Sequence, residues 1–522
     1  MIDVNREIGR RRTFAIISHP DAGKTTLTEK LLLYSGAIAE AGAVRARAGR
    51  SRDVTSDWME LERTRGISVT STVLQFSHRG MVMNLLDTPG HRDFSEDTYR
   101  VLSAVDAAVI VLDAARGVEA QTLKLFQVAQ ARRVPLITFV NKLDRPGLPP
   151  LAIVDDIEAH LGIAATPVTW PVGDGRDFEG VVDRRDLRLW QFERTARGGS
   201  IGDERRVPWE TASNAAHRRE ARGEMELLDG LDVRHDQKRF LAGESTPVFF
   251  GSALWNFGVR LLLDAVVDIA PSPQARVDSR GMPVPTDGET AGQVFKMQVN
   301  LDPRHRDHLA YLRVCSGRFE RGMTLVNHRT GRGVSTKYAH QMFGRERDTA
   351  DVAYPGDVIG LVNAADLQIG DTLSVSGKLA FPPIPTFAPE HFRIARSVDA
   401  AHYKRFRRGM AQLDREGVVQ VLRSREGGER EPIVAAVGEL QFDVALHRLS
   451  GEFGAEPRFD PAPFRLARRT DAPGRNALSN VRGVEIATRG DGTILALFSS
   501  RSWLDLVERD HPDVVLDPIV GL

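Results

Sequence analysis

The stretch Phe14-Ala-Ile-Ile-Ser-His-Pro-Asp-Ala-Gly-Lys-Thr-Thr26 decides the fold of the N-terminal part of the chain. Its four apolar residues, 14–17, predict a short strand that is buried on both faces, and residues 24–34 predict the helix that follows. A loop between a buried strand and a helix N-terminus points successive backbone N–H groups into a concave anion site. We therefore predict a phosphate-binding loop between this strand and this helix.

The loop matches the usual pattern, Gly, four residues, then Gly-Lys-Ser/Thr, at all but one position. Gly23, Lys24 and Thr25 fit, whereas Ser18 stands where the first glycine is expected. Lys24 can reach the β and γ phosphates of a nucleotide, and the Thr25 hydroxyl can ligate Mg²⁺. On these residues alone, an ordinary strand-to-helix turn with an exposed lysine remains the alternative.

Composition narrows the class of protein. The 522 residues carry 70 Lys and Arg against 70 Asp and Glu, so no global basic field favours nucleic acid, and any RNA contact must come from a local patch. The single cysteine, Cys315, excludes an internal disulfide and suits a reducing cytosol. The N-terminus lacks an apolar signal segment, and nowhere do apolar residues run together for the length of a membrane span. We expect a cytoplasmic protein without a membrane partner.

Further apolar runs, separated by amphipathic helical stretches, predict a doubly wound, mostly parallel sheet. In such sheets ligands bind beyond the carboxyl ends of the strands, so the residues after each run carry the information. The runs are residues 81–86, 107–112, 135–140 and 248–250.

Three of these runs end in short polar motifs that fit a guanine nucleotide. Asp87-Thr-Pro-Gly-His91 offers an acid that can hold Mg²⁺ through water and a glycine N–H that can approach a γ-phosphate. In Asn141-Lys-Leu-Asp144 the terminal carboxylate can accept from N1–H and the amine of guanine, which adenine does not offer. In Gly251-Ser-Ala-Leu254 the Ala253 amide can meet guanine O6. Each motif alone is typical of a turn, whereas the ordered set at successive strand ends predicts a nucleotide site.

With these motifs the chain resembles the translational GTPases, and most closely the bacterial class II release factors of translation termination. The resemblance covers nearly the whole chain, with the stretch from about Leu466 the least recognisable part. It rests on residues 17–26, 56–62, 65–68, 87–97, 251–258, 302–307, 353–357, 387–390 and 437–444.

The resemblance implies GTP or GDP with Mg²⁺ as cofactors, and it accommodates Ser18, because this group of GTPases tolerates a non-glycine residue there. Ser68 becomes a second hydroxyl ligand of Mg²⁺ beside Thr25, with Asp87 acting through water. The implied nucleotide-binding residues are Ser18, His19, Pro20, Asp21, Ala22, Gly23, Lys24, Thr25, Thr26, Asp87, Thr88, Pro89, Gly90, His91, Asn141, Lys142, Leu143, Asp144, Ser252, Ala253 and Leu254.

The resemblance also makes His91 the catalytic residue that orients the attacking water, with Ile67 and Pro20 as candidates for an apolar gate. A solvent-facing histidine after a tight turn is the alternative for His91. For His19, inside the phosphate loop, we expect a structural role. Residues 36–52 have no consistent period and suit either a segment ordered by the γ-phosphate and Mg²⁺ or a surface loop.

Proline-rich connectors and changes in periodicity predict three domains. Residues 1–275 form the P-loop GTPase domain, with a charged insertion on the sheet edge around 173–244. Short alternating segments predict a small β-barrel over 284–378. Helical stripes such as Phe406, Met410 and Leu413 predict an α/β sandwich over 385–522.

The function implied is a ribosome-stimulated GTPase that speeds departure of class I, codon-reading release factors after peptide release. Its implied partners are ribosomal RNA, ribosomal proteins and those factors, and we expect a monomer that does not bind DNA. The alternative is a GTP-dependent ribosome-binding factor of the elongation, assembly or protection type with another client. We expect the chain to end after the third domain, and this expectation argues against an elongation-type factor.

Overall fold

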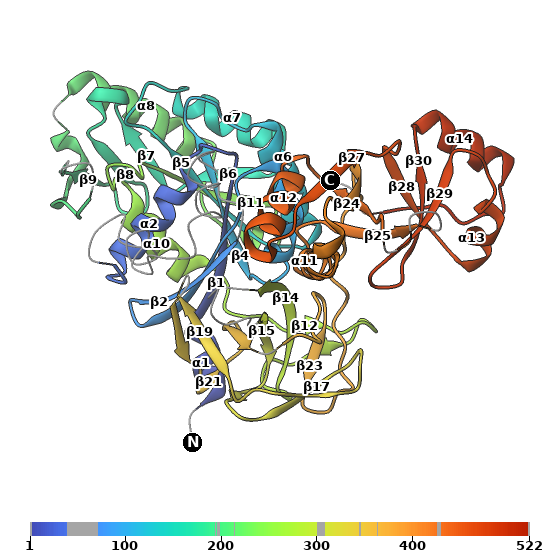
Figure 1. Cartoon of the computed structure of the whole chain (residues 1–522). Helices are drawn as coiled ribbons and strands as arrows, with labels where there is room; N and C mark the ends of the chain where they lie inside the picture. The colour runs from blue at the N-terminus through green and yellow to red at the C-terminus, as the bar shows by residue number, and fades with distance from the viewer. Residues whose placement is uncertain are drawn as a thin grey trace.

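The fold of the chain was obtained as a computed structural model (Figure 1). The candidate residues Ile67 and Ser68, and most of residues 36–52, lie outside the part that it describes. The described residues are 3–38, 71–193, 195, 199–212, 214–299, 308–343, 346–362, 364–424, 428 and 430–519.

The N-terminal part is built on a sheet whose strands follow the buried apolar runs. β1 (Arg11–Ser18) runs parallel to both of its neighbours, and the three strands beyond one neighbour continue in the same direction. The strand beyond the other neighbour is antiparallel. Phe14, Ile16 and Ile17 have no exposed surface, because helices cover both faces of the sheet. In order across the sheet the strands are β2 (Thr72–His78), β3 (Met81–Asp87), β1 (Arg11–Ser18), β4 (Ala107–Asp113), β5 (Leu136–Asn141), β11 (Ser245–Phe250) and β6 (Ala164–Pro167).

Two rows of helices cover this sheet, which confirms the predicted doubly wound fold (Figure 1). One row pairs α2 (Lys24–Tyr34) with α10 (Val259–Ile269), and α1 (Val4–Gly9) precedes β1. Within the residues that the structure describes, no helix is both long enough and apolar enough to cross a membrane. The second row consists of α5 (Ser95–Leu102), α6 (Ala120–Ala131) and α7 (Pro150–Leu161).

Between β6 and β11 the chain builds a second, four-stranded antiparallel sheet, which we call the insertion. The segment is highly charged, yet it has a small core of its own: the Trp170 ring is fully buried and its Nε1 donates to Glu224 at 2.9 Å. Its elements are β7 (Thr169–Val172), β8 (Gly180–Asp183), β9 (Arg188–Phe192), β10 (Glu204–Pro208), α8 (Ala215–Gly230) and α9 (Gln237–Leu241).

The next unit is a barrel of short antiparallel strands, as predicted. Its strand β19 pairs with β2, so the barrel strands continue the N-terminal sheet. The elements are β12 (Arg276–Val277), β13 (Pro283–Val284), β14 (Ala291–Val299), β15 (His308–Ser316), β16 (Phe319–Glu320), β17 (Thr324–Asn327), β18 (Gly333–Ser335), β19 (Ala339–Phe343), β20 (Glu346–Thr349), β21 (Val352–Ala353), β22 (Val358–Val362) and β23 (Thr372–Ser374).

A buried polar cluster holds the barrel against the N-terminal sheet. The Asp357 carboxylate accepts from Arg11 Nε at 2.8 Å, and from the side-chain amides of Gln75 and Asn84 at 3.2 Å each. A methyl group on Gly356 would lie 2.6 Å from the Pro273 ring, so the turn admits no side chain there. The turn before β22 is therefore seated directly on β1, β2 and β3.

The C-terminal domain is an eight-stranded sheet with helices, which confirms the predicted α/β unit. The predicted stripe of Phe406, Met410 and Leu413 is buried between α11 (Tyr403–Glu416), α12 (Leu440–Phe453) and the first strands. Two further helices, α13 (Ala472–Leu478) and α14 (Arg501–Asp510), pack on the far half (Figure 1). In order, the strands are β27 (Pro457–Pro461), β24 (His391–Ser397), β26 (Ile433–Ala436), β25 (Gln420–Ser424), β29 (Val484–Arg489), β30 (Ile494–Phe498), β28 (Leu466–Thr470) and β31 (Asp517–Pro518).

Asp414 and Asp491, two carboxylates of this domain, have pKa values that are shifted in opposite directions. Burial raises the pKa of Asp414 to about 6, although its Oδ1 accepts from the Val421 amide at 2.8 Å. Burial also acts to raise the pKa of Asp491, but hydrogen bonds from Arg489 and the Thr493 amide outweigh it and lower that pKa to about 2.

Replacing Asp414→Asn should raise the apparent melting temperature of the C-terminal domain at pH 7.5. Because the folded pKa of Asp414 lies above its unfolded value, the wild-type domain loses stability as pH rises from about 4 to about 6. The asparagine variant lacks this loss, which amounts to ~1–3 kcal/mol. Calorimetry at pH 4.5 and 7.5 measures it, and an equal gain at both values would contradict the assignment.

Asp491→Asn is the matched control, with the opposite sign. Its folded pKa lies below the unfolded value, so its stabilisation is present above the unfolded pKa and disappears as pH falls toward about 2. This variant should therefore lower the melting temperature at pH 7.5.

Candidate functional site

The predicted phosphate loop lies at the carboxyl end of β1 and leads into α2. Its backbone takes the left-handed conformation at Asp21 (φ 63°) and at Gly23 (φ 98°). A methyl group on Gly23 would lie 2.2 Å from Asn141 Nδ2, so that position requires glycine. Ser18 is buried and its hydroxyl donates to the His19 carbonyl at 2.8 Å, which turns it onto the chain's own backbone. A serine therefore fits where the sequence pattern has glycine.

Lys24 and Asp87 meet at the ends of two adjacent parallel strands. Lys24 Nζ lies 2.6 Å from Asp87 Oδ1, and the Thr28 hydroxyl donates to the same oxygen at 3.3 Å. The Thr88 hydroxyl donates to the Ile16 carbonyl at 2.7 Å, which fixes the end of β3 to β1. The structure thus brings together the cation predicted to face phosphates and the acid predicted to face Mg²⁺, paired with each other.

Asn141 joins the phosphate loop to the two loops predicted to read the base. Its Nδ2 donates to the Ala22 carbonyl at 2.8 Å, and its Oδ1 accepts from the Ala253 amide at 2.8 Å. The Leu143 amide donates to the Gly251 carbonyl at 3.2 Å. Three loops that are more than a hundred residues apart in sequence are therefore held by one buried amide.

Asp144, the residue predicted to read the base, pairs with Ser252 of the neighbouring loop. The Ser252 hydroxyl donates to Asp144 Oδ1 at 2.5 Å, which orients the carboxylate and leaves acceptor capacity on both oxygens. The Ala253 amide, predicted to meet guanine O6, is engaged by Asn141 in this structure. Contact with O6 at this amide requires that hydrogen bond to be shared or exchanged.

Lys142 is held by an acid that the sequence analysis did not single out. Lys142 Nζ donates to Asp113 Oδ2 at 2.8 Å, with Lys142 in the left-handed conformation at φ 71°. Burial acts to raise the pKa of Asp113, and hydrogen bonds from Lys142 and the Ala115 amide outweigh it, so this pKa is lowered. Asp113 ends the buried strand β4, and the same signal that selected Asp87, an acid at a strand end, would have found it.

The loop after β3 carries His91 and lies against the phosphate loop, since a methyl group on Gly90 would lie 3.9 Å from Pro20 Cα. His91 is 31% exposed, and its Nδ1 lies 3.3 Å from Asp93 Oδ1. His19 instead points to Glu119, with Nε2 2.8 Å from the carboxylate. The two histidines therefore face different neighbours. Sequence reasoning assigned no role to Asp93, although it lies within residues 87–97, or to Glu119, which lies outside the stretches that carry the resemblance.

Three successive parts of the chain match family models. The family model for the elongation factor Tu GTP binding domain matches residues 9–272, and that for elongation factor G domain 2 matches residues 289–376. The model for the class II release factor RF3 C-terminal domain matches residues 381–508.

Curated relatives match along nearly the full length. A peptide chain release factor 3 from Synechocystis sp. is 48% identical over 527 residues, covering 99% of this chain and 96% of its own. One from Gloeobacter violaceus is 52% identical over 471 residues, covering 88% of each. A solved structure from Thermus thermophilus is similar with a TM-score of 0.69 and 25% identity, covering 92% of this chain and 73% of its own.

Asn141→Ala should raise the dissociation constants for GTP and GDP together, by about 10- to 100-fold, because two buried hydrogen bonds between the loops are lost. Titration with fluorescent nucleotides measures the effect. Asn327→Ala is the matched control, since Asn327 is also a buried asparagine with two side-chain hydrogen bonds but lies within the barrel. If both variants weaken binding equally, Asn141 acts through general stability and not through the loops.

Proposed function

Because this chain belongs to the peptide chain release factor 3 family, we propose that it dissociates class I release factors from the ribosome after peptide release, driven by its GTP cycle. It is a GTPase of translation termination that interacts with the ribosome. The observation that carries the proposal is the joining of the base loops to the phosphate loop by Asn141, in a chain whose C-terminal domain matches the release factor model.

In the proposed GTP complex the phosphates lie in the loop of residues 18–26. Left-handed backbone at Asp21 and Gly23 and the N-terminus of α2 supply the N–H donors. Lys24 exchanges its carboxylate partner, Asp87, for the β and γ phosphate oxygens. Because that ammonium is buried, it neutralises phosphate charge where water screens it least.

The donor set fits magnesium. Within the described residues no group of three His, Cys, Asp or Glu side chains could hold a metal, and Mg²⁺ prefers a few protein oxygens together with substrate phosphates and waters. Thr25 and Ser68 would supply hydroxyl ligands, and Asp87 would accept from a bound water. When bound, the ion would neutralise negative charge that develops on the phosphates during hydrolysis.

The base is proposed to be guanine. Asp144, oriented by Ser252, would accept from N1–H and the exocyclic amine of guanine, a donor pair that adenine lacks. Ala253 and Leu254 follow Ser252 in the same loop. There guanine O6 would accept from the Ala253 amide, which also donates to Asn141. Selection rests on buried polar groups that a wrong base leaves unpaired, which gives strong discrimination.

Hydrolysis is proposed to depend on His91, which would orient the attacking water beside the γ-phosphate. Phosphoryl transfer needs positioning and charge neutralisation more than covalent chemistry, so unassisted turnover is slow and a docking partner can raise it by roughly 10⁵-fold. The ribosome is the proposed partner. Hydrolysis then times a conformational change and does not itself drive a bond-forming step.

The proposed contacts on the ribosome include the exposed basic face of α11. Lys404, Arg405, Arg407 and Arg408 lie on the surface, opposite the buried stripe. Such side chains suit RNA phosphates or acidic ribosomal proteins. We further propose that the protein acts as a cytoplasmic monomer and uses neither DNA nor a membrane.

The proposal is tested with a fluorescently labelled class I release factor bound to ribosomes that have already released their peptide. Its departure is followed with this protein and GTP, GDP or no nucleotide, and with Lys24→Ala as the control that removes the phosphate-facing cation. Faster, GTP-dependent departure is expected. Unchanged departure, while ribosomes still stimulate GTP hydrolysis, would show a ribosomal GTPase with another client.

Asp144→Asn should weaken GTP binding by about 100-fold or more and transfer preference to xanthosine triphosphate. The new amide donates to xanthine O2 where the carboxylate accepted from the guanine amine. Competition titration measures both affinities. Asp155→Asn, an exposed acid on α7, is the control, and unchanged GTP affinity at Asp144→Asn would remove that residue from base reading.

His91→Ala should retain nucleotide binding and lower ribosome-stimulated turnover by about 100-fold or more. Phosphate release with and without ribosomes measures the two rates. His160→Ala, at a surface histidine on α7 that is 52% exposed, should leave both unchanged. Wild-type turnover in His91→Ala would exclude His91 from the mechanism.

A further inference from the structure

The loop that carries His91 contacts the C-terminal domain through the side chain of Asp93. Asp93 lies in a short 3-10 turn, η1 (Arg92–Phe94), and is 7% exposed. Its Oδ2 accepts from the Leu440 amide at 2.8 Å, and its Oδ1 lies 3.3 Å from His91 Nδ1. A single buried carboxylate thus joins the proposed catalytic histidine to a residue 347 positions later in the chain.

The C-terminal side of this contact is shaped to receive a carboxylate. Leu440 begins α12, where the helix dipole and unpaired N–H groups favour a negative charge. Gly438 closes over the carboxylate so tightly that a methyl group there would lie 2.1 Å from Asp93 Cγ. The Gln441 side chain accepts from the Val437 and Gly438 amides at 2.8 and 3.1 Å, which fixes the turn.

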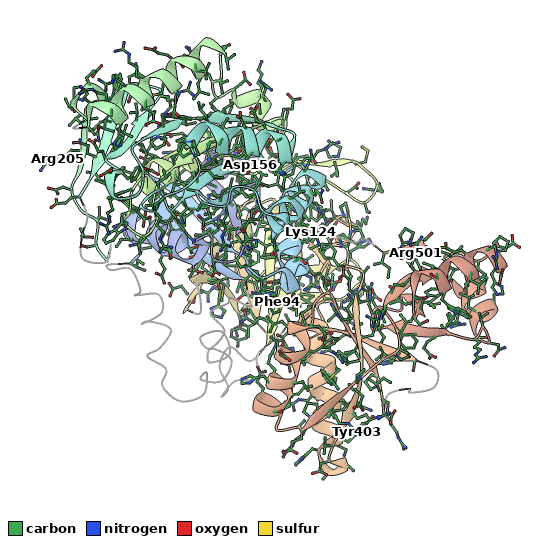
Figure 2. The ribbon with its side chains drawn as sticks, turned by 90° about the horizontal axis from the view of Figure 1, so that it is seen from above. Phe94, Lys124, Asp156, Arg205, Tyr403 and Arg501 are labelled. Carbon is green, nitrogen blue, oxygen red and sulfur yellow. The ribbon has the colours of Figure 1, made fainter. Side chains whose placement is uncertain are left out.

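Apolar and ionic contacts surround the carboxylate. Phe94 packs with Leu440 and Val444, and the Phe94 label in Figure 2 marks the junction of the two domains. Arg100, paired with Glu96 at 2.5 Å, donates to the Gly417 carbonyl at 3.4 Å. The Asp93 contact is therefore part of a docked interface and not an isolated hydrogen bond.

A cavity of about 350 Å³ lies beside the contact, lined by Asp93, Ser95, Lys124 and Glu439 among others. The cavity is partly open to solvent, so free space borders the Asp93 side chain.

We infer that Asp93 is a positioning residue for His91. Its main-chain amide donates to His91 Nδ1 at 3.3 Å and its carboxylate lies beside the same nitrogen, and the docking of α12 on that carboxylate fixes the turn that presents both. With Nδ1 engaged by Asp93, Nε2 is the ring nitrogen left to orient the attacking water. The docking of α12 thereby sets whether His91 is placed for hydrolysis. This inference rests on the proposed role of His91 in the GTPase reaction.

The test compares Asp93→Ala with Gly438→Ala, which sit on opposite sides of the contact. Each should lower ribosome-stimulated, single-turnover GTP hydrolysis by about 10- to 100-fold, the usual cost of misplacing a catalytic group. Nucleotide dissociation constants should stay within about twofold of wild type, because the nucleotide loops are untouched. That binding assay also shows that each variant is folded.

Two matched controls isolate the contact. Glu390→Gln removes an exposed charge from the wall of the same cavity, and Gly223→Ala adds a methyl group where nothing lies within 4 Å. Both should hydrolyse GTP at the wild-type rate. Wild-type rates in Asp93→Ala and Gly438→Ala as well would overturn the inference.

A His91→Ala background separates positioning from general destabilisation of the interface. If Asp93 acts through His91, adding Asp93→Ala there should change the rate by less than about twofold. A further drop of tenfold would show that Asp93 acts by another route. If His91→Ala itself hydrolyses GTP normally, the proposed role of His91 fails, which is distinct from a failure of the Asp93 inference alone.

Discussion

The buried carboxylate of Asp357 is the constraint on which the placement of the site depends. A buried charge costs several kcal/mol unless it is paired and hydrogen-bonded, and here Arg11, Gln75 and Asn84 supply the partners. These three side-chain partners lie on β1, β2 and β3, whereas the barrel turn itself supplies the Tyr354 amide. Because β1 and β3 end in the phosphate loop and Asp87, the barrel is fixed relative to the nucleotide loops through the strands themselves.

The sequence predicted the central strands well because they are buried on both faces. The run 14–17 became the middle of β1, and the helix predicted over 24–34 is α2. The prediction missed strand ends whose burial depends on residues that are distant in the sequence. Arg11 begins β1 with a charged side chain, which is buried because it pairs with Asp357, 346 residues later in the chain. An apolar-run criterion has no means of including such a residue.

The residues of the candidate site also divide into those that the sequence predicted and those that it did not. Motif residues such as Lys24, Asp87 and Asn141 were predictable, because each chemistry needs one residue type at the end of a strand. Asp113 carried that same signal and was passed over for lack of a surrounding motif. Asp93 and Leu440 both lie in stretches that carry the resemblance, but neither stretch by itself predicts that the Asp93 carboxylate accepts from the Leu440 amide.

Each added unit holds a different part of the site. The insertion holds the base loop, since Asn256 Nδ2 donates to the Ser200 carbonyl at 2.8 Å. The Tyr34 hydroxyl, at the end of α2, lies between the Glu204 carboxylate of the insertion and the Asn256 carbonyl. Burial, with the Glu204 carboxylate beside it, raises the pKa of Tyr34, so that hydroxyl remains a donor. The barrel contacts the strands and the insertion contacts the base loop, so both fix the loops that are proposed to bind the nucleotide. The C-terminal domain instead contacts the loop of His91, the residue proposed to orient the attacking water.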